Sequence, residues 1–539
     1  MDKIKFLVID ALARASGSRY ATHDVVGAGP RIVAGIIEHY GYNVDLKAYE
    51  LFIENEVDLR EYDAILVSIM SSDKGALEKI LFKLNKYNYT GLVIVGGPAS
   101  FEYEVLLREF KRIDYVVVGE GEIPLIKILE KPNVLIDRNP DELFNIPALA
   151  YRTSKGIVLT TNRIHTPIDL LNSIKPWIRI DESYRFHKAL RYYVEVLRGC
   201  SNYARPLIKG IDSLNCIDCL TCRSGDFGKR LYCPVDIPPG CGFCSVPYMF
   251  GPPRSRSIDS IVEEVVELVK HGARRIVLSA PDFLDYGREY FVKPNPLTDP
   301  CKPPANVEII ERLLDELTSK SICRDNNVVI SVENIKACLV DEEVARVLGK
   351  YLKNTTIHIG LETGCNWYND YVLGKPITVE QVLNAIKLLV RNGLRPYIYL
   401  MYGLPFANRK VYSDTVEFVK KLSKMGVEKI TLYKYVNLPG TAFQKIKPCI
   451  DEYRDQIIYL KKIVNRFNLE AKKKFLNKEI DVYLVYSKGK YYGYPVKHGP
   501  VVFVKGVNKS DYSNCRAIVR ITEISERFLW GRLISIVNC

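Results

Sequence analysis

The chain has 539 residues, which is too long for one ordinary core and predicts about two to four domains. Hydrophobic residues make up 47% and charged residues 26%, as in ordinary folded soluble proteins. The sequence holds no uncharged apolar run of about 18 residues or more and begins without the layout of a signal peptide. We therefore expect a cytoplasmic protein without a membrane span, whose 14 cysteines are reduced and, where clustered, bind metal.

The formal net charge of +13 is unevenly distributed. Residues 471–539 hold 13 Lys or Arg and 5 Asp or Glu, so this segment alone carries 13 − 5 = +8. Such a segment suits a polyanion, although charge alone favours the solvated surface of a basic protein.

Residues 1–125 alternate strand and helix, with apolar strands expected at 4–9, 62–70, 92–95 and 115–118. This pattern predicts a doubly wound parallel sheet of the α/β class, which binds ligands beyond the carboxyl ends of its strands. Two glycine-bearing turns fall there, Gly96-Gly97-Pro98 and Gly119-Glu120-Gly121. A large planar ligand could approach the backbone closely at these turns. Residues 126–188 read as a connector.

Residues 189–470 again alternate strand and helix, and six strands are expected, at 193–197, 275–279, 328–332, 356–361, 396–401 and 429–433. Strands joined by crossover helices predict a partial or full (β/α) barrel with its chemistry at the carboxyl ends of the strands. Residues 475–539 change character and give five short β runs without an intervening helix. A small five-stranded β-barrel of the OB type fits them.

Seven cysteines lie within residues 200–244, and cysteine thiolates are the usual ligands of iron–sulfur clusters. Cys200 ends the first barrel strand, and Cys241-Gly242-Phe243-Cys244 follows after 40 intervening residues. The inserted segment, 201–240, carries the other four: Cys216, Cys219, Cys222 and Cys233. Their C-x2-C-x2-C run and later Cys-Pro resemble a ferredoxin and predict an auxiliary 4Fe-4S cluster, with a four-thiolate zinc site as the alternative.

The motif Arg198-Gly199-Cys200, the Cys241–Cys244 run and the following Arg254-Ser255-Arg256-Ser257 together resemble the cluster loop of radical S-adenosylmethionine (SAM) enzymes. That family usually has C-x3-C-x2-C with an aromatic residue before the last cysteine, a place that Phe243 fills. In this sequence the inserted segment lengthens the gap between the first two cysteines, Cys200 and Cys241, from 3 to 40 residues. An alternative takes Cys233 as the first ligand, which gives C-x7-C-x2-C. Cys200 is favoured, because the family places its first cysteine at the end of the first strand, where Arg-Gly-Cys lies here.

The resemblance implies a 4Fe-4S cluster on Cys200, Cys241 and Cys244, whose open iron chelates SAM and whose electron cleaves it to methionine and a 5′-deoxyadenosyl radical. It also implies that Ser279 contacts the methionine amine of SAM and that Glu362, in Gly360-Leu361-Glu362-Thr363-Gly364, contacts the ribose. Glu362 could equally be an ordinary carboxylate at the barrel rim. The seven dispersed cysteines are expected to be small buried apolar residues: Cys301, Cys323, Cys338, Cys365, Cys449, Cys515 and Cys539.

The N-terminal part resembles the cobalamin-binding domain that precedes many radical SAM cores. The likeness rests on the two glycine turns, which implies cofactor contacts at Gly96, Gly97, Gly119 and Gly121. No histidine sits in the D-x-H-x-x-G pattern of cobalamin domains that use a histidine ligand. A cobalamin domain without the histidine and an empty, vestigial domain are both compatible with this sequence.

The C-terminal part resembles a TRAM domain, a small RNA-binding barrel of some RNA-modifying enzymes, on the strength of a Ser-x-Arg-x-Leu-x-Gly-Arg pattern that begins at Ser525. Lysines there would contact phosphates. Tyr491, Tyr492 and Tyr494 would stack on bases, unless they pack the barrel.

These resemblances together predict a radical SAM transferase that methylates or methylthiolates RNA, either tRNA or rRNA, and takes its electron from a donor protein. Cobalamin would serve methyl transfer, and the auxiliary cluster would serve sulfur insertion or electron relay. The alternatives are a protein or lipid substrate, or a non-catalytic iron–sulfur binding module.

Overall fold

The computed structural model describes residues 4–17, 24–54, 57–210, 214–507 and 512–539. The chain forms two compact units. The first comprises residues 1–194, 256–276 and 325–328, and the second residues 195–255, 277–324 and 329–539. Strands β9 (Arg191–Glu195) and β12 (Arg275–Ser279) begin in the first unit and end in the second. No helix within the described ranges is long and apolar enough to cross a membrane.

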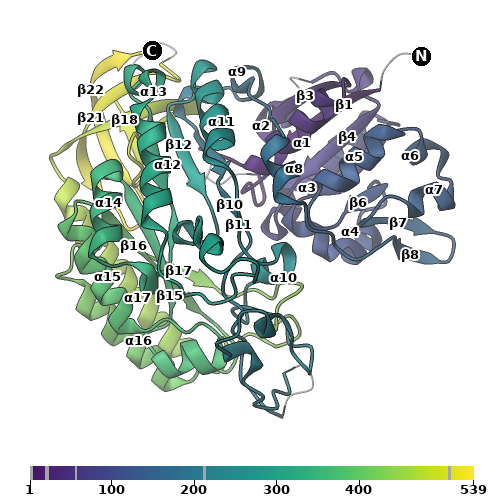
Figure 1. The fold of residues 1–539 in the computed structure, drawn as a ribbon. Coiled ribbons are helices and arrows are strands. Elements are labelled where there is room, and N and C mark those ends of the chain that lie inside the picture. The colour runs from purple at the N-terminus through teal and green to yellow at the C-terminus, as the bar shows by residue number, and fades with distance from the viewer. Residues whose placement is uncertain (1–3, 18–23, 55–56, 211–213, 508–511) are drawn as a thin grey trace. The chain divides into compact units, whose positions relative to one another are not determined.

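The second unit contains the later strands of the predicted barrel. Its parallel sheet has the order β14-β15-β16-β17, and helices connect the consecutive strands β15, β16 and β17 (Figure 1). The strands of this part are β13 (Val329–Val332), β14 (Asn334–Ile335), β15 (Thr356–Glu362), β16 (Arg395–Tyr402) and β17 (Lys429–Lys434). A short antiparallel pair, β10 (Leu197–Arg198) with β11 (Arg254–Ser255), flanks the cysteine-rich insertion, and α10 (Val246–Phe250) lies between these two strands in sequence. The alternation predicted for residues 189–470 is confirmed.

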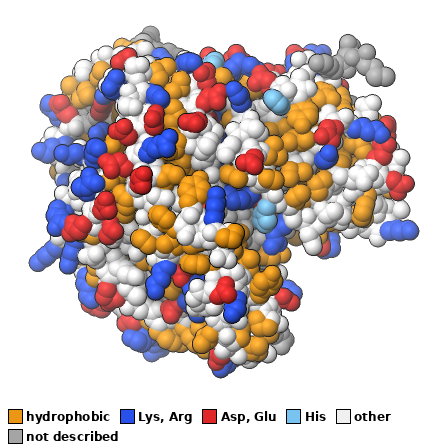
Figure 2. Space-filling view, in the orientation of Figure 1, with side chains coloured by type: hydrophobic (Ala, Val, Ile, Leu, Met, Phe, Trp, Pro, Cys, Tyr) orange, Lys and Arg blue, Asp and Glu red, His pale blue; other side chains and the backbone are white. Residues whose placement is uncertain are grey.

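The helices of this unit cover the sheet with their apolar sides, because their buried residues recur every three or four positions. In α15, for example, Val382, Ile386 and Leu389 are buried. The helices are α12 (Val307–Ser319), α13 (Ser321–Asp325), α14 (Glu342–Leu352), α15 (Val379–Arg391), α16 (Arg409–Leu422) and α17 (Arg454–Lys472). Figure 2 shows acidic and basic side chains interspersed over α12, α14 and α15, so this face carries no single-sign patch.

The C-terminal segment closes a five-stranded barrel in the order β18-β19-β20-β22-β21 (Figure 1, yellow). Alternate residues point inward, among them Val482, Leu484, Val502, Val519 and Leu529. The strands are β18 (Glu479–Ser487), β19 (Lys490–Pro495), β20 (Val502–Lys505), β21 (Arg516–Ile524) and β22 (Leu529–Asn538). The predicted small β-barrel is confirmed, because alternation between turn residues is a direct signal for such strands.

Two pairs of cysteines in the second unit form disulfides, Cys301–Cys338 and Cys515–Cys539. The prediction that all 14 cysteines are reduced, and that these four are isolated apolar residues, is therefore wrong. The partners are 37 and 24 residues apart in sequence, so no local spacing announces the pairing. Of the other dispersed cysteines, Cys323 and Cys365 are buried as expected.

The first unit is built on a seven-stranded sheet with the order β3-β1-β4-β5-β6-β7-β8. The strands are β1 (Lys5–Asp10), β3 (Asn43–Ala48), β4 (Ala64–Ser68), β5 (Leu92–Gly96), β6 (Tyr115–Val117), β7 (Leu149–Thr153) and β8 (Gly156–Leu159). The first five are parallel, and β7 and β8 are antiparallel. The last two lie in the predicted connector, so the sheet extends past residue 125. A short separate strand, β2 (Val25–Val26), pairs with the start of β9.

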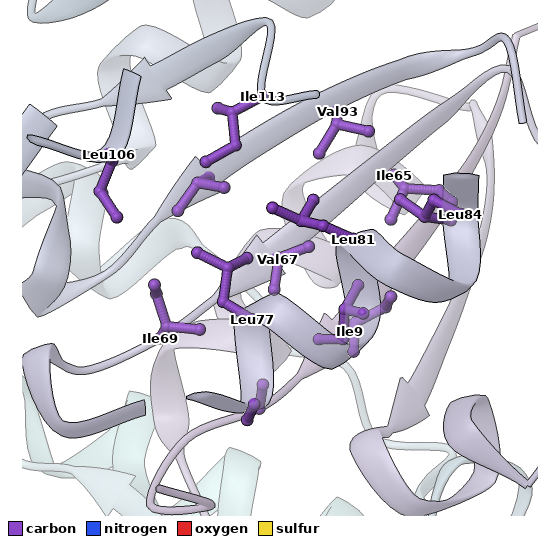
Figure 3. Packing of buried hydrophobic residues seen from close by; sticks show 14 of the residues in the cluster. Ile9, Ile65, Val67, Ile69, Leu77, Leu81, Leu84, Val93, Leu106 and Ile113 are labelled. Carbon is purple, nitrogen blue, oxygen red and sulfur yellow. The ribbon is translucent and has the colours of Figure 1, made fainter. Parts of the chain in front are cut away.

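Aliphatic side chains from α3 pack on this sheet (Figure 3). Leu77, Leu81 and Leu84 follow the helical repeat and point toward Ile65 and Val67 of β4. The helices are α1 (Ala28–His39), α2 (Tyr49–Ile53), α3 (Lys74–Lys86), α4 (Tyr103–Glu109), α5 (Glu122–Glu130), α6 (Val134–Asp137), α7 (Pro140–Phe144), α8 (Ile168–Ser173), α9 (Ile180–Ser183) and α11 (Ile258–Lys270). This core fixes the carboxyl ends of β5 and β6, where the glycine turns lie.

Candidate active site

A glycine turn after β10 places Cys200. Gly199 has a φ of +92°, and a Cβ atom there would collide with the carbonyl oxygen of Pro252. Only glycine adopts this conformation at so close an approach without strain. The next residue is held by a hydrogen bond from the Cys200 backbone N–H to the Gly251 carbonyl, at 3.1 Å. The Arg-Gly-Cys motif therefore has a local structural reason.

Asn202 brings the separated cysteines together. Its backbone N–H donates to Cys200 Sγ at 3.4 Å, and its side-chain Nδ2 donates to Cys241 Sγ at 3.2 Å. The same Nδ2 donates to the Gly374 carbonyl at 3.0 Å, which fixes the amide. The two ends of the insertion meet where Gly240 N–H donates to the Ala204 carbonyl at 2.8 Å. Cys200 thus lies beside Cys241 despite the insertion.

The Cys241–Cys244 run forms a tight turn, closed by the Cys244 N–H donating to the Cys241 carbonyl at 2.8 Å. Gly242 lies against the ring of Phe443, where an added Cβ would come within 2.6 Å of the ring. Phe243 is half-buried between the two cysteines. All three thiols are free, so Cys200, Cys241 and Cys244 remain available as metal ligands.

The three thiols strongly favour the protonated form in the metal-free protein. Burial raises the pKa of Cys200 to about 11 and that of Cys244 to about 12, and it also raises the pKa of Cys241. The Lys336 ammonium partly opposes the shift at Cys200, and the Lys375 ammonium does so at Cys241 and Cys244. A metal cluster fits this environment, because thiolates formed on metal binding would be stabilised by both cations and by Asn202.

A buried charged network fixes the residue after Cys200. The Asp285 carboxylate accepts hydrogen bonds from the Ser201 hydroxyl at 2.9 Å and from the Ser201 N–H at 3.2 Å. Lys336 Nζ donates to Ser201 Oγ at 2.9 Å, to Asp282 at 2.9 Å and to Asp285 at 2.7 Å. Burial opposes ionisation of Asp285, but Lys336 and Arg288 outweigh it and lower its pKa.

Glu362 sits at a β-bulge of β15 with a φ of +73°, which is unusual for a residue other than glycine. Its carboxylate forms a 2.5 Å ion pair with Lys375 Nζ. A Cβ at Gly360 would lie 2.8 Å from Glu362 Oε1 and 3.0 Å from Lys375 Nζ, so the first glycine of the motif leaves room for this pair. Ser279 ends β12, and its carbonyl accepts the Val196 N–H at 2.9 Å.

The four inserted cysteines line one small cavity, together with Leu207, Ile237 and Arg205. Arg205 is buried and donates to the carbonyls of Ile237 at 2.7 Å and Arg230 at 2.8 Å, which ties the insertion to its base. Cys233 therefore lies with the other inserted cysteines, Cys216, Cys219 and Cys222. Among the residues that the structure describes, no three Cys, His, Asp or Glu side chains are placed to hold a single metal ion.

The glycine turns of the first unit lie at the carboxyl ends of β5 and β6. A Cβ at Gly96 would meet no atom within 4 Å, whereas one at Gly97, which has a φ of +87°, would lie 2.7 Å from the Ile69 carbonyl. Gly119 N–H donates to the Ser100 hydroxyl at 3.1 Å, and Gly121 precedes α5. Open backbone at Gly96 fits the close approach of a large cofactor.

Several residues that organise the two sites belong to no recognisable sequence motif. Asn202 donates to the sulfurs of two cysteines, and Asp285 and Lys336 hold Ser201 beside Cys200. In the first unit, the buried Asp73 carboxylate accepts the N–H groups of Ala13 at 2.9 Å and Ala15 at 2.7 Å, which orders the loop after β1. The sequence offers one signal for such residues: Asp73 and Asp282 each follow a predicted strand within three residues.

Comparison with known proteins assigns a family to the cysteine-bearing region and to the N-terminal sheet. The family model described as "Radical SAM superfamily" matches residues 232–419, and the "B12 binding domain" model matches residues 19–129. An uncharacterized protein of Methanopyrus kandleri is 37% identical over 541 residues, covering 99% of this chain and 96% of the relative. The chain belongs to the radical SAM superfamily.

Two further relatives bear on this radical SAM enzyme. A tRNA-2-methylthio-N(6)-dimethylallyladenosine synthase of Wolbachia pipientis is 23% identical and covers 93% of this chain and 95% of its own. The radical SAM methyltransferase TsrM of Kitasatospora setae, solved with cobalamin and a [4Fe-4S] cluster, aligns with a TM-score of 0.55 and 14% identity. That alignment covers 82% of this chain and 74% of TsrM, and it shows a shared fold.

Proposed function

We propose that this radical SAM enzyme cleaves SAM reductively and transfers a methyl or methylthio group to an RNA, either tRNA or rRNA. The observation that carries the proposal is that Asn202 joins Cys200 to Cys241 across the insertion, with Cys244 in the same tight turn as Cys241 and all three thiols free. The net charge of +8 on residues 471–539 and the tRNA-modifying relative support RNA as the substrate.

Three thiolates, from Cys200, Cys241 and Cys244, would hold a 4Fe-4S cluster. When bound together with SAM, such a cluster supplies the electron for cleavage of the sulfonium. Asn202 would donate hydrogen bonds to two of the thiolates, and Phe243 would shield the turn. The ion pair with Lys375 would orient the Glu362 carboxylate toward the ribose of SAM, and Ser279 would lie at the methionine amine.

The four inserted cysteines would hold an auxiliary 4Fe-4S cluster, for sulfur donation or for electron relay from a donor protein. Their shared cavity and the well-anchored Arg205 support this role. Four thiolates carry a large negative charge, which a buried guanidinium beside them would offset.

Cobalamin would lie on the open backbone at Gly96, with Gly97, Gly119 and Gly121 shaping the turns. Bound there, it would supply methyl-group chemistry. The matching B12-binding region supports this assignment.

The test uses the full-length protein, reconstituted anaerobically with iron, sulfide and cobalamin. Total cellular RNA is incubated with this enzyme, a strong reductant and SAM that carries a deuterated methyl group, and the digested nucleosides are analysed by mass spectrometry. The proposal expects a labelled nucleoside with the wild type and none with Cys244→Ala. If SAM is cleaved while no nucleoside carries the label, the RNA substrate is refuted.

A further inference from the structure

An aromatic row crosses three strands on the outer face of the C-terminal barrel. Tyr492 of β19 pairs with Phe503 of β20, and Phe503 pairs with Trp530 of β22. The ring centroids of Phe503 and Trp530 are 4.8 Å apart and those of Tyr492 and Phe503 are 5.0 Å apart. Phe528 adds an edge-on contact to Phe503 at 4.5 Å. Phe503, Phe528 and Trp530 are partly exposed, so their rings form a surface.

A row of cations runs parallel to the aromatic row, two residues further along. Lys505 pairs with Arg532, and Arg532 pairs with Arg520 on the next strand. All three side chains are exposed. Like charges directly opposite one another on adjacent strands are destabilising. Arg520 is neutralised by Glu479 at 2.7 Å and Lys505 by Glu523 at 3.0 Å, yet no ion pair of Arg532 occurs within the described part of the chain.

Tyr491, Tyr492 and Tyr494, which are expected to stack on bases, are not exposed on this face, although Tyr492 forms the buried end of the aromatic row. Tyr492 is 2% exposed and Tyr494 is 3% exposed, and Tyr491 packs against the barrel core. The rings of Tyr492 and Tyr494 are thus covered and that of Tyr491 packs on the core, so none of the three offers a free face to a base. Phe503 and Trp530 are the better candidates for stacking on bases, because their rings lie beside the cations. Lys505 Nζ, for example, lies 4.6 Å from the centre of the Trp530 ring.

We propose that these two rows bind a single-stranded segment of RNA, with bases stacked on Phe503, Phe528 and Trp530 and phosphates on Lys505, Arg520 and Arg532. This inference rests on the proposed function, because it assumes an RNA substrate. Rows two residues apart on a strand are separated by about 7 Å, the scale of one nucleotide from base to phosphate. Ring faces can stack only on exposed bases, and a duplex covers its base faces.

The experiment measures binding of the full-length protein to a fluorescent 12-nucleotide single-stranded RNA, and to the same sequence in a duplex, by anisotropy at several salt concentrations. Trp530→Ala is expected to weaken single-strand binding about tenfold without changing the salt dependence. Arg532→Glu is expected to weaken binding and to reduce the slope of log K against log salt by about one unit. Trp530→Phe should restore most of the affinity, which guards against misfolding of the alanine variant.

Lys387→Glu is the matched control, since Lys387 is an exposed lysine on α15, outside the barrel. It should bind as the wild type does. If wild-type protein binds RNA but Trp530→Ala and Arg532→Glu bind equally well, or if duplex binds as tightly as the single strand, the surface is wrong and the RNA substrate stands. If wild-type protein binds neither RNA, this surface proposal fails, and the labelling of nucleosides by the enzyme decides separately whether RNA is the substrate.

Discussion

Asn202 links the two halves of the separated cysteine motif through one backbone and one side-chain hydrogen bond. We predict that Asn202→Ala lowers the iron affinity of the Cys200, Cys241 and Cys244 site about 10- to 100-fold, because partners of metal ligands orient them. Iron content and the electron paramagnetic resonance signal of the reduced protein measure this. Asn384→Ala, an exposed position on α15, is the control. Equal iron content in the two variants would show that Asn202 has no such role.

The thiol pKa values predict an order of reactivity in the metal-free protein. Hydrogen bonding, chiefly from the Thr221 hydroxyl at 3.2 Å, lowers the pKa of the exposed Cys219, whereas burial raises those of Cys200 and Cys244 to about 11 and about 12. Only the thiolate reacts, so brief alkylation at pH 8 should label Cys219 first, and raising the pH should speed labelling of Cys200 and Cys244. Peptide mass spectrometry reports the order. Labelling of Cys244 as fast as Cys219 would contradict these shifts.

The cysteines themselves could be predicted from the sequence, because their spacing is a local signal. Asn202, Asp285 and Lys336 could not, because their roles depend on which loops the barrel brings together. Ser201 and Lys336 are 135 residues apart, yet their side chains are hydrogen-bonded.

The cysteine-rich insertion is the element whose chemistry is most open to test. We predict about eight irons per reconstituted chain and about four in the Cys219→Ser/Cys222→Ser double variant, since each four-iron cluster needs its thiolates. Iron, zinc and sulfide are determined on the same samples. Wild-type protein with about four irons and one zinc would show that the insertion holds zinc.

Two loops are closed by disulfides, which predicts a specific thiol count. The chain has 14 cysteines, and 14 − 4 = 10 should react with a thiol reagent in denaturant after metal removal. Reduction should raise the count to 14 and destabilise the C-terminal barrel by about 2–4 kcal/mol, because a closed loop restricts the unfolded chain. A count of 14 without reductant would show that the disulfides are absent.

Most elements followed from hydrophobic periodicity, and the five β runs expected in residues 475–539 form as β18 to β22. Strands β7 and β8 were missed because they are short and antiparallel and continue a sheet whose other strands are parallel. They form because β7 pairs with β6 and β8 pairs with β7, and such pairing is a tertiary property.

At the scale of the whole molecule, the order of modules was predictable because each carries its own pattern: glycine turns after strands, clustered cysteines, and short alternating strands with excess positive charge. The family models match the first two regions. The charge pattern alone did not locate a binding face. That required the strand register, which aligns Lys505 with Arg532 and Phe503 with Trp530.

We propose above all that Cys200, Cys241 and Cys244 support reductive cleavage of SAM. The most direct measurement is the amount of 5′-deoxyadenosine formed by anaerobically reconstituted protein with a strong reductant, SAM and total RNA. We expect turnover by the wild type and none by Cys241→Ala, which loses one cluster ligand. If neither protein forms 5′-deoxyadenosine, or if both form it equally, these cysteines do not carry the reaction.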